Sequence, residues 1–167
     1  RNHRITAWVK EKLAHLRATG RENEEFAFAT HGTMADPRWL DPAIDPNDRK
    51  ANWCYMGDPR IVNMSPVGLA RFSTLRSWLS QWSHSDANAD GLHSLATVSK
   101  PVLVMNNTAD DACTPSHSQR LFDAVAHDRK KLVHIKGATH YYQDQPELAQ
   151  QAAQTIRTWL TENDLLA

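Results

Sequence analysis

Pro101-Val-Leu-Val-Met105 is a short apolar run, and Lys131-Leu-Val-His-Ile135 is a second one farther along the chain. Between them, a polar segment rich in turn-forming residues leads into a stretch with helical spacing from Ser116 to His127. Two buried-type strands joined by a helix are typical of a parallel βαβ unit. The carboxyl ends of parallel strands meet at one sheet edge, where open α/β sheets bind ligands. The stretch therefore predicts an α/β fold with a functional site at that edge.

The segments on either side of this unit predict mainly helices. Apolar residues recur at helical spacing from Ile5 to Leu16 and again over residues 146–160. Ser65-Pro66 has the pattern of a helix start, and Phe72, Leu75, Leu79 and Trp82 would share one face of the helix that follows. Residues 32–64 contain several prolines among Asp-rich turns, which favours an irregular lid or insertion.

Composition limits the classes of function. The chain has 167 residues, of which 41% are apolar and 23% charged, as in a folded domain with a core. Lys+Arg and Asp+Glu are equal at 19 each, so no net charge attracts nucleic acid or an anionic membrane surface. No apolar stretch reaches the roughly 20 residues that span a bilayer. These features favour a small-molecule substrate, with neither nucleic acid nor membrane as a partner.

The two cysteines favour a reducing compartment. Cys54 and Cys113 are far apart and match no metal-ligand spacing, so we expect a cytoplasmic protein with reduced thiols. Cys113 stands near a candidate catalytic residue, but a buried loop thiol is the more ordinary interpretation than a nucleophile. The chain starts at Arg1 with no signal-peptide pattern, and an amphipathic helix begins almost at once. We therefore expect a fragment or one piece of a cleaved or split protein, although removal of a tag could also expose such an end.

An aspartate and a histidine follow the two predicted strands. An imidazole acts as a general base near neutral pH when a carboxylate fixes its tautomer and stabilises the imidazolium. Asp111 and His140 are 140 − 111 = 29 residues apart, which leaves room for one helix and one strand. Asp110 competes for the acid role; Asp111 is favoured because it stands four residues before Pro115, where the helix opens. A polar turn at the two aspartates and a surface position for the histidine remain alternatives.

Taken together, Val102-Leu-Val-Met105, Asp111-Ala-Cys-Thr-Pro115 and Lys136-Gly-Ala-Thr-His140 resemble the C-terminal portion of the α/β-hydrolase superfamily. The resemblance covers roughly residues 98–162. It implies an α/β fold in which residues 98–167 form the C-terminal part of a parallel sheet with flanking helices. Residues 1–97 would be a mainly helical lid. Asp111 and His140 would be the acid and the base of a catalytic triad.

The resemblance also implies an activity. Members of the superfamily are hydrolases, so an esterase-like enzyme that cleaves an ester, amide or related carbonyl bond is expected, with no cofactor and no metal. The chain contains no Gly-x-Ser-x-Gly elbow to carry the nucleophile. We therefore expect the nucleophile to come from an N-terminal part of the same protein or from a second chain. The alternative is a non-catalytic binding or regulatory fragment with a hydrolase-like fold.

A third pattern favours a turn over a metal site. Asp86-Ala-Asn-Ala-Asp-Gly91 matches the first half of an EF-hand calcium loop. The twelfth position of such a loop carries a bidentate glutamate, and here it is Thr97. We interpret the segment as a capped polar turn.

Overall fold

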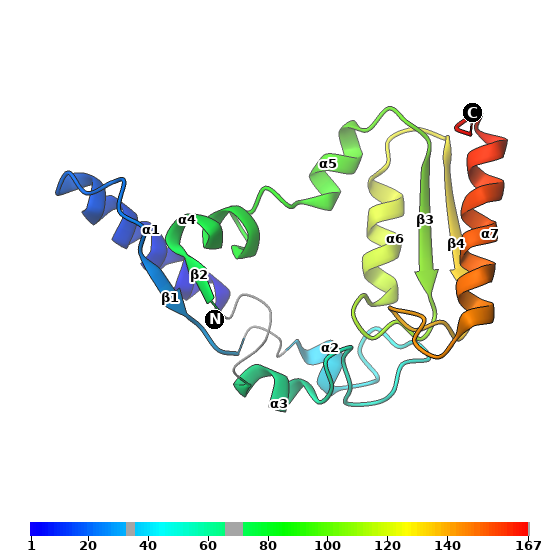
Figure 1. Ribbon diagram of the computed structural model, residues 1–167, viewed down its shortest axis with the longest axis horizontal. Helices are drawn as coiled ribbons and strands as arrows, with labels where there is room; N and C mark the ends of the chain where they lie inside the picture. The colour runs from blue at the N-terminus through cyan, green and yellow to red at the C-terminus, as the bar shows by residue number, and fades with distance from the viewer. Residues whose placement is uncertain (33–35, 66–71, 167) are drawn as a thin grey trace. The chain divides into compact units, whose positions relative to one another are not determined.

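The computed structural model describes residues 1–32, 36–65 and 72–166, and the chain divides into two compact units (Figure 1). Unit 1 comprises Arg1–Asp36 and Asp58–Asp90, and unit 2 comprises Pro37–Gly57 and Gly91–Ala167. The sequence predicted a single division between residues 97 and 98. Residues 37–57 instead belong with unit 2, because their backbone hydrogen-bonds to it: Asp48 N–H donates to Thr108 O at 2.7 Å, and Tyr55 N–H to Asp111 O at 2.8 Å. That residues 1–97 act as a lid stays a prediction.

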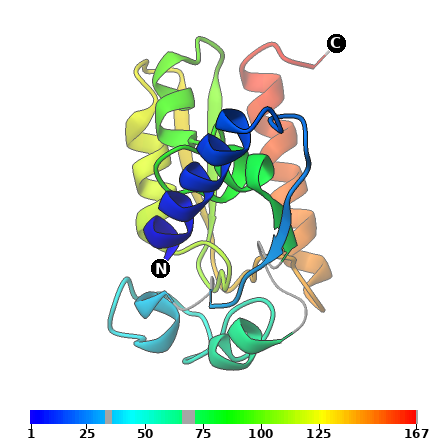
Figure 2. The same cartoon turned by 90° about the vertical axis from the view of Figure 1, so that its left-hand side faces the viewer.

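Unit 1 combines helices with an antiparallel strand pair (Figure 2). Its elements are α1 (Asn2–Ala18), β1 (Ala27–Ala29), α3 (Pro59–Met64), β2 (Phe72–Thr74), α4 (Leu75–Ser77) and the π-helical turn η1 (Trp78–Trp82). The helix predicted over Ile5–Leu16 is confirmed as part of α1. Strands β1 and β2 pair from Ala27↔Thr74 to Ala29↔Phe72, a pairing that the sequence pattern did not indicate.

The helix predicted to start at Ser65-Pro66 needs correction. Pro66 lies outside the described residues, but Phe72 is not helical: it belongs to β2, and its side chain is 72% exposed. The helix begins at Leu75, where the Thr74 hydroxyl accepts a hydrogen bond from Ser77 N–H at 3.2 Å and caps the first turn. Strand pairing with β1 thus takes the place of the expected helix at residues 72–74.

Trp78 lies at the centre of unit 1. It packs with Val9, Leu16 and Leu75 in a buried cluster, and its own side chain is 0% exposed. Its indole Nε1–H donates a hydrogen bond of 3.0 Å to the hydroxyl of Thr6. Trp78 is therefore a core residue of unit 1.

Unit 2 contains the predicted βαβ unit. Its elements are α2 (Pro37–Leu40), α5 (Gly91–Thr97), β3 (Val102–Asn107), α6 (Pro115–Ala124), β4 (Lys130–Ile135) and α7 (Pro146–Glu162). Strands β3 and β4 are parallel, in register from Val102↔Lys130 to Asn107↔Ile135. The mixed α/β class is therefore confirmed, although the described residues contain only this one parallel pair and the pair in unit 1.

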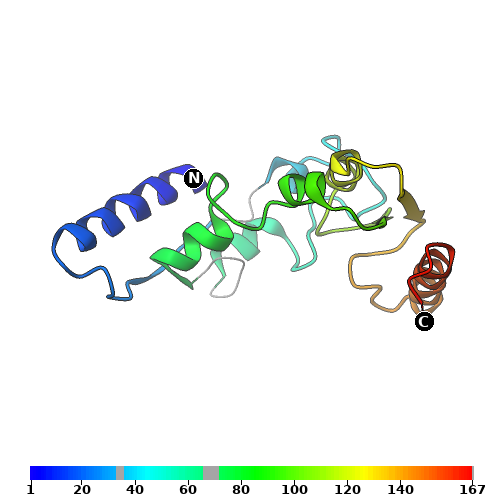
Figure 3. The same cartoon turned by 90° about the horizontal axis from the view of Figure 1, so that it is seen from above.

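The two longer helices of unit 2 lie on either side of the parallel strands (Figures 1 and 3). Pro115 and Pro146 occupy the first turns of α6 and α7, where a missing N–H has no cost. Val125 at the end of α6 and Ile135 of β4 are buried. The register brings the carboxyl ends of β3 and β4 together, so the loops that follow them meet at one edge.

No helix in the described part of the chain is both long enough and apolar enough to cross a bilayer.

Candidate functional site

Asp110 and His140 meet at the carboxyl end of the parallel strand pair. His140 Nδ1 lies 3.1 Å from Oδ2 and 3.2 Å from Oδ1 of Asp110. A carboxylate only accepts hydrogen bonds, so this contact favours the tautomer in which Nδ1 carries the proton. Nε2 is then left with a lone pair that can accept a proton from another group. This is the arrangement of the acid and the base in a catalytic triad.

The sequence favoured Asp111 as the partner of His140, whereas the carboxylate that contacts the His140 ring in the structure is that of Asp110. Asp110 and Asp111 are neighbours in a turn, and they line different cavities. The Asp111 side chain lines a separate cavity of about 220 Å³ with Tyr55 and Tyr141. Burial raises the pKa of the Asp111 carboxyl, and the nearby Asp110 charge adds to that rise. Asp111 is thus placed beside the pair rather than within it; the catalytic roles of all three residues stay predictions.

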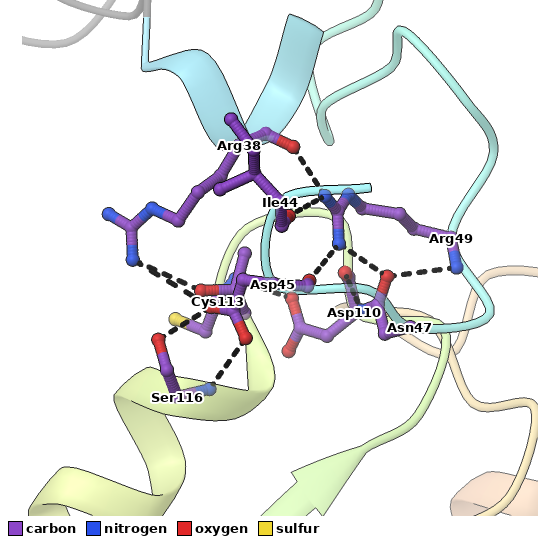
Figure 4. A network of polar contacts seen from close by, with 9 residues as sticks. Arg38, Ile44, Asp45, Asn47, Arg49, Asp110, Cys113 and Ser116 are labelled. Carbon is purple, nitrogen blue, oxygen red and sulfur yellow. Dashed lines mark hydrogen bonds and ion pairs between the residues drawn. The ribbon is translucent and has the colours of Figure 1, made fainter. Parts of the chain in front are cut away.

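Local hydrogen bonds fix the Asp110 carboxylate. Its Oδ1 accepts from the backbone N–H groups of Ala112 and Cys113, both at 2.7 Å, in a turn closed by the side chain. The Asp110 side chain is only 10% exposed. From a distant part of the chain, Asn47 Nδ2 donates to the Asp110 carbonyl at 2.9 Å (Figure 4). The carboxylate is therefore oriented before any substrate arrives.

A tight turn after β4 presents His140. Gly137 has φ +74°, a left-handed conformation in which a side chain would be strained. Gln145 spans the turn: its Oε1 accepts from Thr139 N–H at 2.9 Å, and its Nε2 donates to Gly137 O at 2.8 Å. Asn107, the last residue of β3, donates to Thr139 O at 2.9 Å. These bonds tie the loop that carries His140 to the strand that leads to Asp110.

A second layer of polar contacts comes from residues 37–57 (Figure 4). The Arg49 guanidinium donates to the backbone carbonyls of Arg38, Ile44 and Asp45, which closes this segment into a compact loop. The Asp45 carboxylate then accepts from Ser116 N–H at 3.1 Å and from the Ser116 hydroxyl at 2.5 Å. It caps the N-terminus of α6 from outside the helix. The sequence identified only an irregular Asp-rich loop here, so these supporting residues were missed.

The contacts of the Asp45 carboxyl at the start of α6 lower its pKa. Partial burial would raise its pKa, but hydrogen bonds from Ser116 and Thr114 outweigh burial and hold the pKa below its usual value. A group whose folded pKa is depressed stabilises the fold above its unfolded pKa and loses that contribution as the pH falls through the folded value. Asp45 therefore contributes stability at neutral pH that disappears in acid.

Asp45→Asn is expected to lower the free energy of unfolding by about 0.5–1 kcal/mol at neutral pH, because the charge at the N-terminus of α6 is lost. Asparagine tolerates the positive φ of 52° at this position, so the backbone is kept. Urea unfolding followed by circular dichroism at pH 7 and pH 3 checks this, with Asp128→Asn, an exposed aspartate of the same unit, as control. The difference from wild type should shrink at pH 3; a difference independent of pH would contradict the assignment.

A cavity of about 540 Å³ lies next to the pair. Its wall includes Asp110, Cys113 and His140 together with apolar side chains of β3, α6 and α7. Among the described residues, no hydroxyl or thiol hydrogen-bonds to the His140 ring. Burial raises the pKa of the Cys113 thiol, and the neighbouring Asp110 charge raises it further, which disfavours the thiolate form that a nucleophile needs. The wall of the cavity thus contains the Asp110–His140 pair, but the described part of the chain contributes no activated nucleophile to it.

In the segment that matches half of a calcium loop, the first aspartate, Asp86, contacts other side chains of unit 1. The Asp86 carboxylate forms an ion pair of 2.5 Å with Lys10 and accepts hydrogen bonds from the hydroxyls of Ser83 and Ser85. These contacts fit the interpretation of residues 86–91 as a capped polar turn.

Comparisons of the chain with models of protein families, with curated proteins and with solved structures found no match. What the structure itself establishes is the mixed α/β class. Its parallel strand pair brings an aspartate and a histidine together. The resemblance to the α/β-hydrolase superfamily gains no support from these comparisons and stays a prediction.

Proposed function

We propose that the chain supplies the acid and the base of a hydrolase of the α/β-hydrolase type, which cleaves an ester, amide or related carbonyl bond. The observation that carries the proposal is the contact of 3.1 Å between His140 Nδ1 and Asp110 Oδ2 at the carboxyl end of a parallel strand pair. His140 Nε2 takes the proton of the nucleophile and later returns it to the leaving group. Asp110 holds the imidazole in the required tautomer and stabilises its charged form.

The nucleophile in this proposal is carried by a polypeptide segment outside these residues, on the same protein or on a second chain. Two observations support that source: the chain has no Gly-x-Ser-x-Gly elbow, and the thiol nearest the pair has a raised pKa. The cavity of about 540 Å³ beside His140 is large enough for a small acyl or alcohol group. Its apolar residues, among them Leu121 and Ile156, suit a hydrocarbon portion of the substrate.

The test is labelling of the natural-length protein with a fluorophosphonate probe, followed by peptide mapping. The expected result is one labelled serine on a segment outside residues 1–167. His140→Ala should abolish the label, since the serine then lacks its base. His134→Ala, which alters an exposed histidine of β4 that contacts Asn106, should keep it. A folded protein that takes no label would contradict a serine hydrolase.

The second candidate is a non-catalytic binding or regulatory protein. The absence of a hydroxyl or thiol bonded to His140 within the described residues favours it. In that case the Asp110–His140 contact is structural: it ties the loop after β3 to the loop after β4. An unlabelled protein whose unfolding free energy falls on His140→Ala would support this candidate.

A further inference from the structure

The Asp110–His140 pair has a third neighbour that the proposed hydrolase does not use. Three potential metal-ligand atoms, one each from Asp110, Cys113 and His140, all lie within 4.8 Å of one another. The set offers a carboxylate oxygen, a thiol sulfur and an imidazole nitrogen. All three are donors that Zn²⁺ accepts in proteins, and a thiolate selects zinc over magnesium or calcium.

The separations are close to those of a tetrahedral site. Zinc–ligand bonds of about 2.0–2.3 Å place neighbouring ligand atoms roughly 3.3–3.6 Å apart. Asp110 Oδ2 and His140 Nδ1 are already 3.1 Å apart. The other separations are within 4.8 Å, so side-chain movements on the order of 1 Å would complete the set.

The surroundings also fit a bound ion. The three side chains line one cavity of about 540 Å³, which leaves room for a water as the fourth ligand. Asp110 is buried and held by backbone N–H groups, while Cys113 is three residues away on the same turn. A carboxylate and a thiolate together neutralise the two charges of the ion. The Arg38 guanidinium, whose charge acts on the Cys113 thiol, donates a hydrogen bond of 3.1 Å to the Thr114 hydroxyl and forms an ion pair of 4.0 Å with Asp45.

We propose that Asp110, Cys113 and His140 form a zinc-binding site whose occupancy excludes the acid–base pairing of Asp110 with His140. The ion binds Nδ1 of His140, whose proton moves to Nε2, and an oxygen of the Asp110 carboxylate, so it replaces the hydrogen bond between these two atoms. The Cys113 thiol loses its proton to solvent on binding and coordinates as thiolate. The metal-bound form therefore holds the site in a state in which the pair cannot transfer protons.

Titration of the 167-residue chain, freed of metal by a chelator, with Co²⁺ and then Zn²⁺ tests this proposal. Thiolate coordination of Co²⁺ gives a ligand-to-metal charge-transfer band in the near ultraviolet, and Zn²⁺ should displace it at one ion per chain. Cys113→Ser should remove the band and weaken Zn²⁺ binding by about 100-fold or more, since a ligand is lost. Circular dichroism of each variant shows that it is folded.

Two variants serve as matched controls. Cys54→Ser removes the other thiol of the chain and should keep the band. His117→Ala removes a histidine that lines the same cavity but is not among the three donors, and should leave the affinity within about 3-fold. A folded wild-type chain that binds no Zn²⁺, or a band that persists in Cys113→Ser, would overturn the proposal. No substrate is involved, so either result is independent of the proposed hydrolase activity.

Discussion

Replacing Asp110 by asparagine is expected to lower the turnover of a p-nitrophenyl ester by the natural-length protein by about 10⁴-fold. The asparagine amide can still accept from Ala112 and Cys113 N–H, so the loop keeps its shape. Its NH₂ group, however, would face His140 Nδ1 and favour the tautomer with the proton on Nε2. That tautomer cannot take a proton from the nucleophile, and the loss should fall on kcat rather than KM.

The matched variant is Asp111→Asn, one residue along the same turn. Its side chain lines a separate cavity with Tyr55, so turnover should stay within about 3-fold of wild type. Steady-state kinetics of the two variants, with circular dichroism as a check of folding, measure this difference directly. Equal losses of turnover at the two aspartates would show that the contact of 3.1 Å between Asp110 Oδ2 and His140 Nδ1 does not determine the activity.

The largest effect on stability is expected from Trp78→Ala in unit 1. The side chain is 0% exposed, so its removal leaves a cavity and should cost about 3–5 kcal/mol. Part of that loss comes from the Thr6 hydroxyl, which would no longer receive the indole hydrogen bond of 3.0 Å. Amide hydrogen exchange of α1, which packs on this cluster, reports the change in unit 1 alone.

Phe72→Ala provides the comparison for Trp78→Ala. This aromatic residue of the same unit is 72% exposed, and its removal should cost less than about 1 kcal/mol. Trp78→Phe keeps most of the side-chain volume and removes the indole N–H donor, so its cost in unfolding free energy should lie between those of Phe72→Ala and Trp78→Ala. Similar exchange rates in Trp78→Ala and Phe72→Ala would contradict the assignment of Trp78 to the core.

Elements whose cause is local were predictable from the sequence. The run at 101–105 is continuous because a parallel strand covered on both faces needs apolar residues on each face. The run at 131–135 is interrupted by Lys131 and His134, which are exposed in β4. Pro115 and Pro146 mark the starts of α6 and α7 because proline fits the first turn of a helix. The helical spacing within α1 and α7 is equally local. These features establish the mixed α/β class and the edge at which the loops meet.

Features that depend on distant partners were not predictable. The choice between Asp110 and Asp111 is made by the loop that carries His140 and by Asn47, which bonds to the Asp110 carbonyl from 63 residues away. Helical spacing continued through Phe72, but pairing with β1 makes that residue part of a strand. Asp45 caps α6 across 71 residues. No local pattern encodes contacts of this kind, because each depends on how the segments pack.

The most direct test of the Asp110–His140 pair is nitrogen NMR of the His140 ring in the 167-residue chain, recorded under conditions in which the ring is neutral. The structure predicts a proton on Nδ1 in wild type and in Asp111→Asn, and a shift toward the Nε2–H tautomer in Asp110→Asn. A wild-type ring with its proton on Nε2, or a tautomer unchanged by Asp110→Asn, would contradict the pairing and the mechanism that rests on it.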